Sequence, residues 1–462
     1  MDKEKKLTPN LPKGFKDRYG SELETKKKIV SKIENIFKSY GYQPLETPAL
    51  EISENIGSFL AEDPNNPMSD VFTFKDEKES LTLRYDLSAP LSRFIAQNYM
   101  NIVFPFKRYA YGDVFRQEKA DVARFRSFSQ FDADIIGDVN EAQADAEICN
   151  LIADSFLGCG LKKEQFVINV SNKKILQGLL REIKIPDEKQ YQVLKTIDKL
   201  DRLGFEGVEK LLKDGRTDGS GAFIAGCKLS DDQVSQIKTT INSKNLNELK
   251  SNLKNELSIT GVNELEELYE VLSYGNNLER VQTNICITRG LSYYSSFVVE
   301  TNLNFKIKNA KGKEVSSGSC GSGGRYNSLI SRFKGADYKG TGMSIGIDRL
   351  LYALNQIKEI KVKPQSPVLV CILDKKYIQN CYEIINQLRE KGINSEIYLD
   401  QNKNLKKQLQ YADRKKLDIA IICGENELKD EKLTIKKLNS SKENDQLSIS
   451  RNELINEIKK LI

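Results

Sequence analysis

The sequence contains neither histidine nor tryptophan among its 462 residues. Without an imidazole group, the chain cannot form a Ser-His-Asp triad or a metal site with histidine ligands, and it cannot use histidine for acid–base catalysis. Any chemistry must therefore rely on arginines, carboxylates and hydroxyl groups, or on a metal ion held by oxygen ligands.

Cysteine pairs and long apolar runs are also missing. No CxxC pair occurs, which is typical of reduced thiols in a cytosolic protein and not of a disulfide framework or zinc site. No apolar run approaches the roughly 18 residues of a membrane span, so we expect no membrane contact. The polar start MDKEKKLTPN has no apolar segment behind it, so we expect no secretory signal and a cytoplasmic protein. The cysteines are Cys149, Cys159, Cys227, Cys286, Cys320, Cys371, Cys381 and Cys423.

The composition is that of a globular protein, with 39% hydrophobic and 29% charged residues. The length allows two or three domains with cores of their own. The net charge of +6 is modest, so it permits a polyanionic partner without requiring one.

Changes in composition along the chain predict four segments. Residues 1–171 and 266–355 alternate strand and helix patterns, and residues 172–265 between them indicate a lysine-rich helical insertion. A linker-like stretch at 355–367 precedes a small α/β domain at 366–462.

Within the first segment, apolar spacing predicts a helix over 24–42, a helix that starts near Ser88, and a third over about 140–158. Two strand patterns are joined by a polar loop at 119–123, which predicts a long antiparallel hairpin.

The second strand of this hairpin, RFRSFSQFDADIIG at 124–137, has an unusual polar face. Side chains of an extended strand alternate between two faces, so one face carries Arg126, Phe128, Gln130, Asp132 and Asp134. An antiparallel strand with one face in water would explain this pattern. The alternative is a surface that binds a polar ligand.

Arginines lie at the open end of the predicted hairpin. Arg116 closes the first strand, and Arg124 and Arg126 open the second. A guanidinium group binds phosphate oxygens in a bidentate manner and keeps its charge, so inward-facing arginines favour a phosphate site. Surface ion pairs with Glu118 and Asp121 would account for the same residues.

Two stretches with closely spaced glycines are further candidates. GGRYNSL at 323–329 would let the backbone approach a ligand closely, or would form a flexible loop. GTGMSIGIDRL predicts a strand that turns into a helix and places Arg349 at the helix start, where anions are favoured. The latter stretch lacks the GxGxxG order of a dinucleotide site.

Together these stretches resemble the class II aminoacyl-tRNA synthetases, and specifically the histidyl-tRNA synthetase family. GYQPLETPALE, FRQEKADVARFRSFSQFDADIIG and GMSIGIDRL resemble the three class II motifs in order. RGLSYYSSFVVE resembles the histidine-specific segment RGLDYYTG, and GGRYNSL resembles GGRYDGL. The resemblance begins at PKGFKDRYG and covers nearly the whole chain.

The resemblance implies an α+β fold with an antiparallel sheet flanked by helices, a helical insertion and a C-terminal α/β anticodon-binding domain. It implies a ligase that activates histidine with ATP to histidyl-adenylate and transfers it to the 3′ end of tRNA(His), releasing AMP and pyrophosphate. It also implies Mg²⁺ as a companion of ATP, with no protein side chain assigned as a metal ligand, and a homodimer.

The resemblance assigns the site residue by residue. Arg116 would contact the α-phosphate and the substrate carboxylate, and Phe128 would stack on the adenine. The expected catalytic residues are Arg289, Arg116 and Gln130. The expected ATP-binding residues are Arg116, Glu118, Arg124, Phe128 and Arg349. The expected histidine-binding residues are Asp86, Leu87, Ser88, Arg116, Gln130, Asp134, Arg289, Tyr293 and Tyr294.

Several positions depart from the family pattern, but none removes a charged group assigned above, so we expect activity to survive. Asp348 stands where many members have glutamate, and Ser129 where many have histidine. The remaining departures are Ser292 for aspartate, Ser296 for glycine, and Asn327 with Ser328 for the DG pair.

Three other classes of protein fit the sequence less well than a histidyl-tRNA synthetase. A regulatory paralogue that binds histidine for ATP phosphoribosyltransferase generally lacks the anticodon domain and loses arginines that this chain keeps. A prolyl or threonyl enzyme has no place for RGLSYY, and a pure RNA-binding module would not need the arginines assigned to ATP.

The C-terminal domain holds 18 lysines and arginines against 15 acidic residues. A solvated helix face or tRNA contact would explain its basic stretch equally well by charge alone, and the family position favours the anticodon. We expect the insertion to clamp the acceptor arm of the tRNA and not to edit, because buried hydrogen bonds to imidazole already reject other amino acids. The basic stretch comprises Lys403, Lys406, Lys407, Arg414, Lys415 and Lys416.

Overall fold

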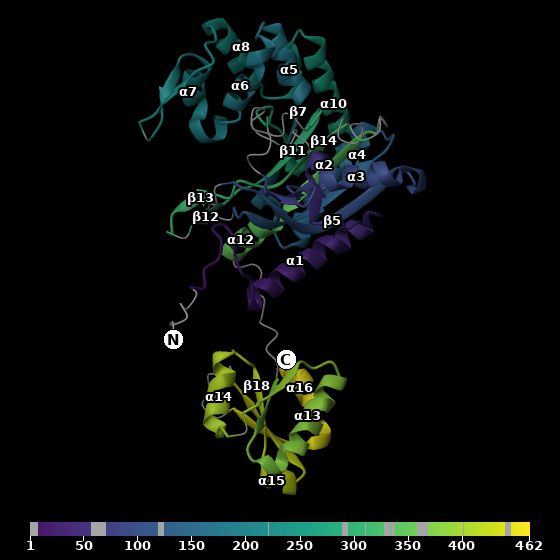
Figure 1. Ribbon diagram of the computed structural model, residues 1–462, viewed down its shortest axis with the longest axis vertical. Helices are drawn as coiled ribbons and strands as arrows, with labels where there is room; N and C mark the ends of the chain where they lie inside the picture. Colours follow the sequence, from purple (N-terminus) through teal and green to yellow (C-terminus); the bar gives the residue numbers. More distant parts are fainter. Residues whose placement is uncertain are drawn as a thin grey trace. The chain divides into compact units, whose positions relative to one another are not determined.

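The structure is a computed structural model, and the chain divides into two compact units, each with a hydrophobic core of its own (Figure 1). The larger unit is Met1–Arg18 with Thr25–Ile360, and the smaller is Tyr19–Glu24 with Lys361–Ile462. The residues described are 8–56, 71–118, 124–219, 221–288, 294–309, 311–327, 333, 338–357, 368–400, 402–438 and 445–462.

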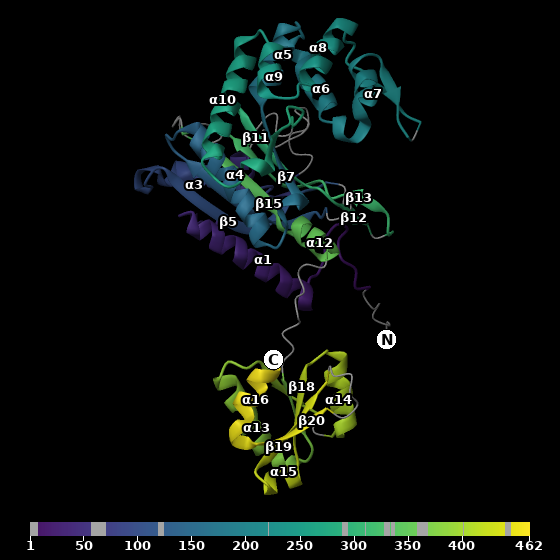
Figure 2. The same cartoon turned by 180° about the vertical axis from the view of Figure 1, so that it is seen from behind.

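An eight-stranded sheet forms the centre of the larger unit (Figure 2). Its strand order is β1-β5-β6-β15-β14-β11-β7-β10. All neighbours from β5 to β7 are antiparallel, whereas β1 and β10 pair in parallel at the two edges. The strands are β1 (Gln43–Pro44), β5 (Phe106–Phe115), β6 (Ser127–Ile136), β7 (Phe166–Asn172), β10 (Val281–Thr283), β11 (Phe297–Leu303), β14 (Ser319–Arg325) and β15 (Gly340–Gly346).

Strands β5 and β6 confirm the predicted hairpin, with Phe106 opposite Ile136 and Phe115 opposite Ser127. The odd-numbered face of β6 lies in the main core, where Phe131 meets Phe37 edge-on at 4.9 Å between ring centroids. The helices whose apolar residues share this core include α1 (Gly20–Ser39), α4 (Glu141–Gly158) and α12 (Ile347–Ile357). The even-numbered face of β6 is therefore left for other contacts.

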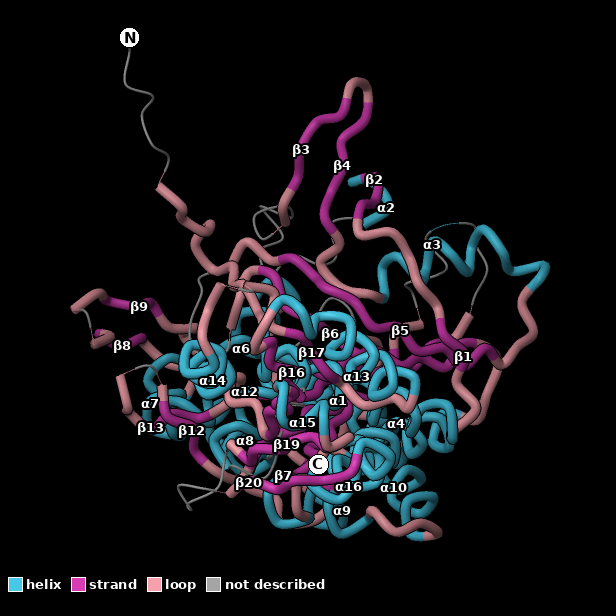
Figure 3. Tube along the Cα trace, turned by 90° about the horizontal axis from the view of Figure 1, so that it is seen from below, coloured by secondary structure: helices cyan, strands magenta, loops and turns pink. Residues whose placement is uncertain are grey.

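Helix α3 (Ser88–Asn98) packs near the end of that even-numbered face, where Leu91 and Ile95 cluster with Ile136. Beside it lies a small sheet in the order β2-β4-β3, and the hairpin of β3 and β4 projects away from the main sheet (Figure 3). The remaining elements here are β2 (Leu50–Ile52), α2 (Ser53–Ile56), β3 (Thr73–Asp76), β4 (Glu79–Leu83), β12 (Lys306–Lys308) and β13 (Glu314–Ser316).

The lysine-rich middle of the chain is helical, and its helices gather beyond the β7 side of the sheet (Figure 1). Helix α10 continues past residue 265, where the composition placed the end of the insertion. The elements are α5 (Lys173–Glu182), α6 (Asp187–Ile197), α7 (Leu200–Leu212), α8 (Asp231–Ile241), α9 (Leu246–Ser251) and α10 (Glu256–Ser273), with a hairpin of β8 (Gly215–Thr217) and β9 (Phe223–Ala225).

The smaller unit has the α/β fold expected for the C-terminal domain. Its sheet order is β17-β16-β18-β19-β20, in which β16 pairs in parallel with β17 and β18. Helices α13 (Ile378–Glu390) and α16 (Leu454–Leu461) pack on one face, and α14 (Leu405–Arg414) packs on the other. The other elements are β16 (Val368–Ile372), β17 (Ser395–Ile397), β18 (Ile419–Cys423), α15 (Glu425–Lys429), β19 (Lys432–Lys437) and β20 (Gln446–Ser450).

Across both units, none of the helices in the described ranges combines the length and the apolar character needed to cross a bilayer.

Candidate active site

The even-numbered face of β6 is polar and buried. Asp132 and Asp134 are each 2% exposed, and Gln130 is 8% exposed. The interpretation of this face as a solvated strand surface is therefore wrong. Buried polar groups need partners, so their surroundings show what the face can bind.

The polar face continues across the sheet in register. Asp132 lies opposite Ser344 of β15, Ser344 opposite Ser322 of β14, and Ser322 opposite Glu300 of β11. Glu300 in turn lies opposite Asn169 of β7. This polar row joins residues that are far apart in sequence, so only strand pairing could reveal it.

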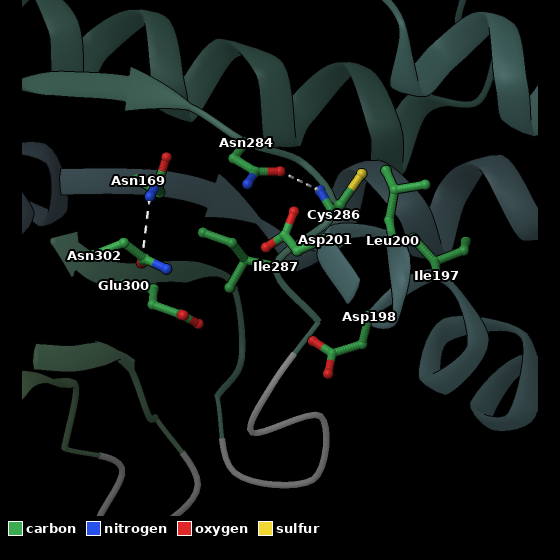
Figure 4. Close-up of a pocket in the computed structure, with 10 residues that line it drawn as sticks. All are labelled: Asn169, Ile197, Asp198, Leu200, Asp201, Asn284, Cys286, Ile287, Glu300 and Asn302. Atoms are coloured by element: carbon green, nitrogen blue, oxygen red, sulfur yellow. Dashed lines mark hydrogen bonds between the residues drawn. The ribbon is translucent and has the colours of Figure 1, made fainter. Parts of the chain in front are cut away.

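A pocket lies at the β7 end of the polar row (Figure 4). Glu300 and Asn169 line it from the sheet, and Asp198 and Asp201 line it from the junction of α6 and α7. Ile287 also lines this pocket, two residues before Arg289. The wall of this pocket is therefore rich in carboxylates.

Asp134 is held from two sides. Arg108 of β5 forms an ion pair with Asp134 Oδ2 at 2.6 Å, and the side chains are 0% and 2% exposed. The Tyr326 hydroxyl donates a hydrogen bond to Asp134 Oδ1. Burial raises the pKa of Asp134, whereas the Arg108 charge and the Tyr326 hydrogen bond oppose that rise. The glycine at 342 is needed here, because a Cβ would collide with Asp134 Oδ1.

Asp86 and Leu87 connect α3 to the same site. Asp86 Oδ1 accepts hydrogen bonds from the backbone amides of Ser88 and Ala89 at 3.1 and 2.9 Å, which caps the helix start. Arg108 Nη2 donates to the Leu87 carbonyl at 3.0 Å. Burial raises the pKa of Asp86, and the Ala89 amide opposes the shift. The structure thus brings these residues beside Asp134.

Arg116 lies between two aromatic rings, 4.3 Å from the centroid of Tyr85 and 5.1 Å from that of Phe128. Glu118 forms an ion pair with Arg124 and lies 4.0 Å from Arg116. The predicted ion pairing with Glu118 is therefore present, whereas Asp121 lies outside the described residues. Since Arg124 is half exposed, its pair with Glu118 contributes little to stability.

The strand-to-helix prediction for GTGMSIGIDRL is confirmed, because β15 leads directly into α12. Arg349 donates a hydrogen bond to the Ser319 carbonyl of β14. In GGRYNSL, the alternative of a flexible loop is wrong for Gly323, Gly324 and Arg325, which lie in β14, whereas Ser328 and Leu329 lie outside the described residues. A Cβ at Gly324 would approach the Tyr294 ring to 2.8 Å, so this glycine makes room for an aromatic side chain.

Tyr294, the last residue of the RGLSYY segment, lies within the described residues. Its carbonyl accepts a hydrogen bond from Lys173 Nζ. Burial raises the pKa of Tyr294, and the carboxylates of Asp86, Asp132 and Asp134 add to that effect. Arg289 and Tyr293, assigned to histidine binding, lie outside the described residues.

Sequence reasoning missed two partners of this site and assigned no role to a third residue. Arg108 stands in the aromatic-rich strand FPFKRYAYGDVF, Tyr326 in the glycine-rich stretch GGRYNSL, and Asp132 on the polar face of β6. Alternation puts Arg108 on the same face of β5 as the buried Ala110 and Val114, but only the register against β6 places it opposite Asp134.

Comparison with known proteins agrees with this architecture. The family model for histidyl-tRNA synthetase matches residues 14–350, and the model for the anticodon binding domain matches residues 367–461. A histidine–tRNA ligase of Pelagibacter ubique is 58% identical over 465 residues, covering 100% of both chains. One of Bartonella bacilliformis is 39% identical, covering 94% of this chain and 90% of that protein. The crystal structure of histidyl-tRNA synthetase from Nostoc sp. PCC 7120 superposes with a TM-score of 0.79 at 26% identity, covering 99% and 100%.

An antiparallel sheet with a buried polar floor, followed by an α/β anticodon-binding unit, defines a class II aminoacyl-tRNA synthetase. The expected fold class is thereby confirmed. The chain belongs to the histidyl-tRNA synthetase family, and its enzymatic class is that of an ATP-dependent aminoacyl-tRNA ligase.

Proposed function

We propose that the polar floor above β6 is where this ligase forms histidyl-adenylate, before histidine passes to the 3′ end of tRNA(His). The observation that carries the proposal is the cluster of Asp86 with the buried side chains of Gln130 and Asp134, next to Arg116. Carboxylates and an amide suit an ammonium group and an imidazole, and the arginine suits a phosphate.

In the proposed assignment, Asp86, Ser88 and Gln130 hold the α-amino group of histidine, with Leu87 beside them. Gln130 Oε1 is buried and has no hydrogen-bond partner among the described residues, which supports a substrate donor there. Asp134, Tyr294 and Tyr293 line the imidazole pocket.

ATP is proposed to bind at the open end of the hairpin. Glu118 accepts from the adenine amino group, Phe128 stacks on the adenine, and Arg124 and Arg349 hold the outer phosphates. When ATP binds, Arg124 gives up its ion pair with Glu118 and binds phosphate oxygens instead. Arg116, which lies over the Phe128 ring, moves aside so that the adenine can stack on that ring.

The reaction is an in-line displacement, in which the histidine carboxylate attacks the α-phosphate and pyrophosphate leaves. Such a step needs positioning and charge neutralisation more than acid–base help, so a chain without histidine loses nothing essential. Arg116 and Arg289 are proposed to supply the neutralising charge, and Gln130 the positioning.

Mg²⁺ is proposed to arrive with ATP. Within the described ranges, no group of three or more Cys, Asp or Glu side chains is placed to hold a metal ion. We therefore assign no metal ligand among those residues and no step to the metal.

The remaining proposals concern partners and organisation. We propose that residues 366–462 bind the anticodon of the tRNA and that the insertion at 172–265 holds its acceptor arm. The insertion separates the two segments of the catalytic core, 1–171 and 266–355. We also propose a homodimer that acts in the cytoplasm. Exposed basic residues on α14 support the first of these proposals, because they offer phosphate contacts.

Pyrophosphate exchange with ATP, measured with each of the twenty amino acids in turn, tests the function. Histidine alone should support exchange, and the charged product should form only with tRNA(His). Exchange with another amino acid, or none with histidine, would contradict the proposal.

A further inference from the structure

We propose that Asp132 is a further specificity-determining residue, whose carboxylate accepts a hydrogen bond from the imidazole of bound histidine. The inference rests on the proposed function, because it takes the even-numbered face of β6 as the histidine site. Gln130 and Asp134 flank Asp132 on that face at a spacing of two residues each. Asp132 thus lies between Gln130, which is assigned to the α-amino group of histidine, and Asp134, which is assigned to the imidazole.

The three carboxylates of the site differ in how many hydrogen-bond donors they already have. Asp134 Oδ1 accepts a hydrogen bond from Tyr326, and its Oδ2 is held by the charge of Arg108 in an ion pair, without a hydrogen bond among the described residues. Asp86 Oδ1 accepts two amides of α3. Among the described residues, Asp132 accepts one hydrogen bond, from Ser344 Oγ to Oδ1. Its Oδ2 therefore keeps the spare acceptor capacity that an imidazole N–H can use.

The charges around Asp132 lead to the same conclusion. Arg108 is the cation that acts on it most strongly, but that guanidinium is paired with Asp134 at 2.6 Å. On the other side, β15 presents the hydroxyl of Ser344, which carries no charge. A buried carboxylate without an ion pair is costly unless a donor enters. The charged and titratable groups that face Asp132 are Arg108 on β5, Asp134 on β6, Asp86 before α3, Arg84 after β4 and Tyr294.

This arrangement makes histidine recognition sensitive to pH. Burial raises the pKa of Asp132 to about 7; Asp134 and Asp86 add to the rise, whereas Arg108 and Ser344 oppose it. Above that pH the carboxylate is ionised and accepts a hydrogen bond from imidazole. Below it the carboxyl group is protonated and uncharged, so it accepts this hydrogen bond only weakly, and kcat/KM for histidine falls as the pH decreases through about 7.

The test compares the wild-type enzyme with Asp132→Asn in pyrophosphate exchange between pH 6 and pH 8. The KM for histidine at pH 8 should rise about tenfold or more, while the KM for ATP stays within about twofold. The ratio of wild-type to variant kcat/KM for histidine should grow about tenfold from pH 6 to pH 8, as one ionisation near pH 7 requires. Titration of the substrate itself cancels in this ratio.

Ser344→Ala is the matched control, because it removes the donor to Oδ1 but keeps the Asp132 carboxylate. It should keep a pH-dependent kcat/KM for histidine, with the midpoint moved to higher pH, because the Ser344 hydrogen bond lowers the pKa of Asp132. Thermal melting checks that each variant is folded, and Asp132→Ser replaces Asp132→Asn if the latter does not fold. An unchanged KM for histidine, or an unchanged pH profile in the folded variant, would overturn the proposal.

Imidazole propionate, which lacks the α-amino group, separates the two nitrogens that Asp132 can contact. It should act as a competitive inhibitor, and Asp132→Asn should raise its inhibition constant by the same factor as the KM for histidine. A raised KM for histidine with unchanged inhibition would place Asp132 at the ammonium group and overturn the imidazole assignment. The proposed function is judged separately, since it fails if the wild-type enzyme does not exchange pyrophosphate with histidine.

Discussion

At the scale of single residues, the ion pair of Arg108 and Asp134 contributes both to the stability of the sheet and to the proposed histidine pocket. Both side chains are almost fully buried. Arg108 Nε and Nη1 have no hydrogen-bond partner among the described residues, so Asp134 provides most of the compensation for this buried charge. Removing one member of such a pair costs about 3–5 kcal/mol, whereas replacing both by apolar or neutral groups costs much less.

Asp134→Asn should therefore raise the KM for histidine steeply and lower the free energy of unfolding by about 3–5 kcal/mol, because Arg108 loses its counter-charge. The KM for ATP should stay close to wild type. Adding Arg108→Met to this variant should recover stability in urea unfolding but not histidine affinity. If histidine affinity survives Asp134→Asn, the imidazole pocket lies elsewhere.

Arg289 is the proposed main catalytic group of activation, since a fixed cation interacts more strongly with the crowded α-phosphate in the transition state than in bound ATP. Arg289→Ala should lower kcat of pyrophosphate exchange by about 10²–10³, or about 3–4 kcal/mol. Melting should be normal, and transfer from preformed histidyl-adenylate should be near normal. A structural arginine paired with Glu300 would give the reverse result: a lower melting temperature with kcat retained in the folded fraction.

At the scale of elements, Arg325 connects the sheet to helices on two sides. From the end of β14 it forms ion pairs with Glu141 and Asp145 of α4, and it lies 3.3 Å from Glu264 of α10. Burial raises the pKa of Asp145 to about 6, although the Arg325 charge opposes the shift. Tyr326 follows directly in the chain, so this junction also orients a residue that contacts Asp134.

Arg325→Met should destabilise the larger unit by about 3–5 kcal/mol, because Asp145 would remain buried without its cation. Lys250→Met is a suitable control, since it breaks an exposed ion pair with Glu266 on α10 and should cost less than about 1 kcal/mol. Urea unfolding of both variants measures the difference. Equal small effects would mean that Arg325 is dispensable for the junction.

At the scale of the whole molecule, the chain separates into a unit with the buried polar floor and a unit with a sheet covered on both faces. In the smaller unit, α14 carries the exposed side chains of Lys406 and Lys407, whereas α13 and α16 cover the opposite face. If the smaller unit binds the anticodon, changes on α14 should affect tRNA charging but not amino-acid activation.

The double variant Lys406→Glu with Lys407→Glu should raise the KM for tRNA. It should also make the slope of the logarithm of the tRNA-binding constant against the logarithm of salt concentration shallower by about one to two. Pyrophosphate exchange should be unchanged. The control is Lys391→Glu with Lys459→Glu, which makes the same charge change at exposed positions directly after α13 and on α16. Equal losses in both variants would indicate a general electrostatic effect and not a binding face.

The sequence by itself determined the family, the α+β class, the β5–β6 hairpin and the polar identity of one face of β6. These features depend on local spacing, because strand alternation and motif order are properties of short stretches. The positions assigned by motif at Asp86, Gln130 and Asp134 therefore needed no structure to be named.

Only the tertiary structure decided that Arg108 and Tyr326 hold Asp134, that Ser344 holds Asp132, and that a polar row extends to Asn169. These contacts join strands separated by many residues, and their register is set by the packing of the whole sheet. A shift of one residue in any strand would turn its polar side chains to the opposite face. Local pattern thus named the polar residues, and long-range strand pairing determined their partners.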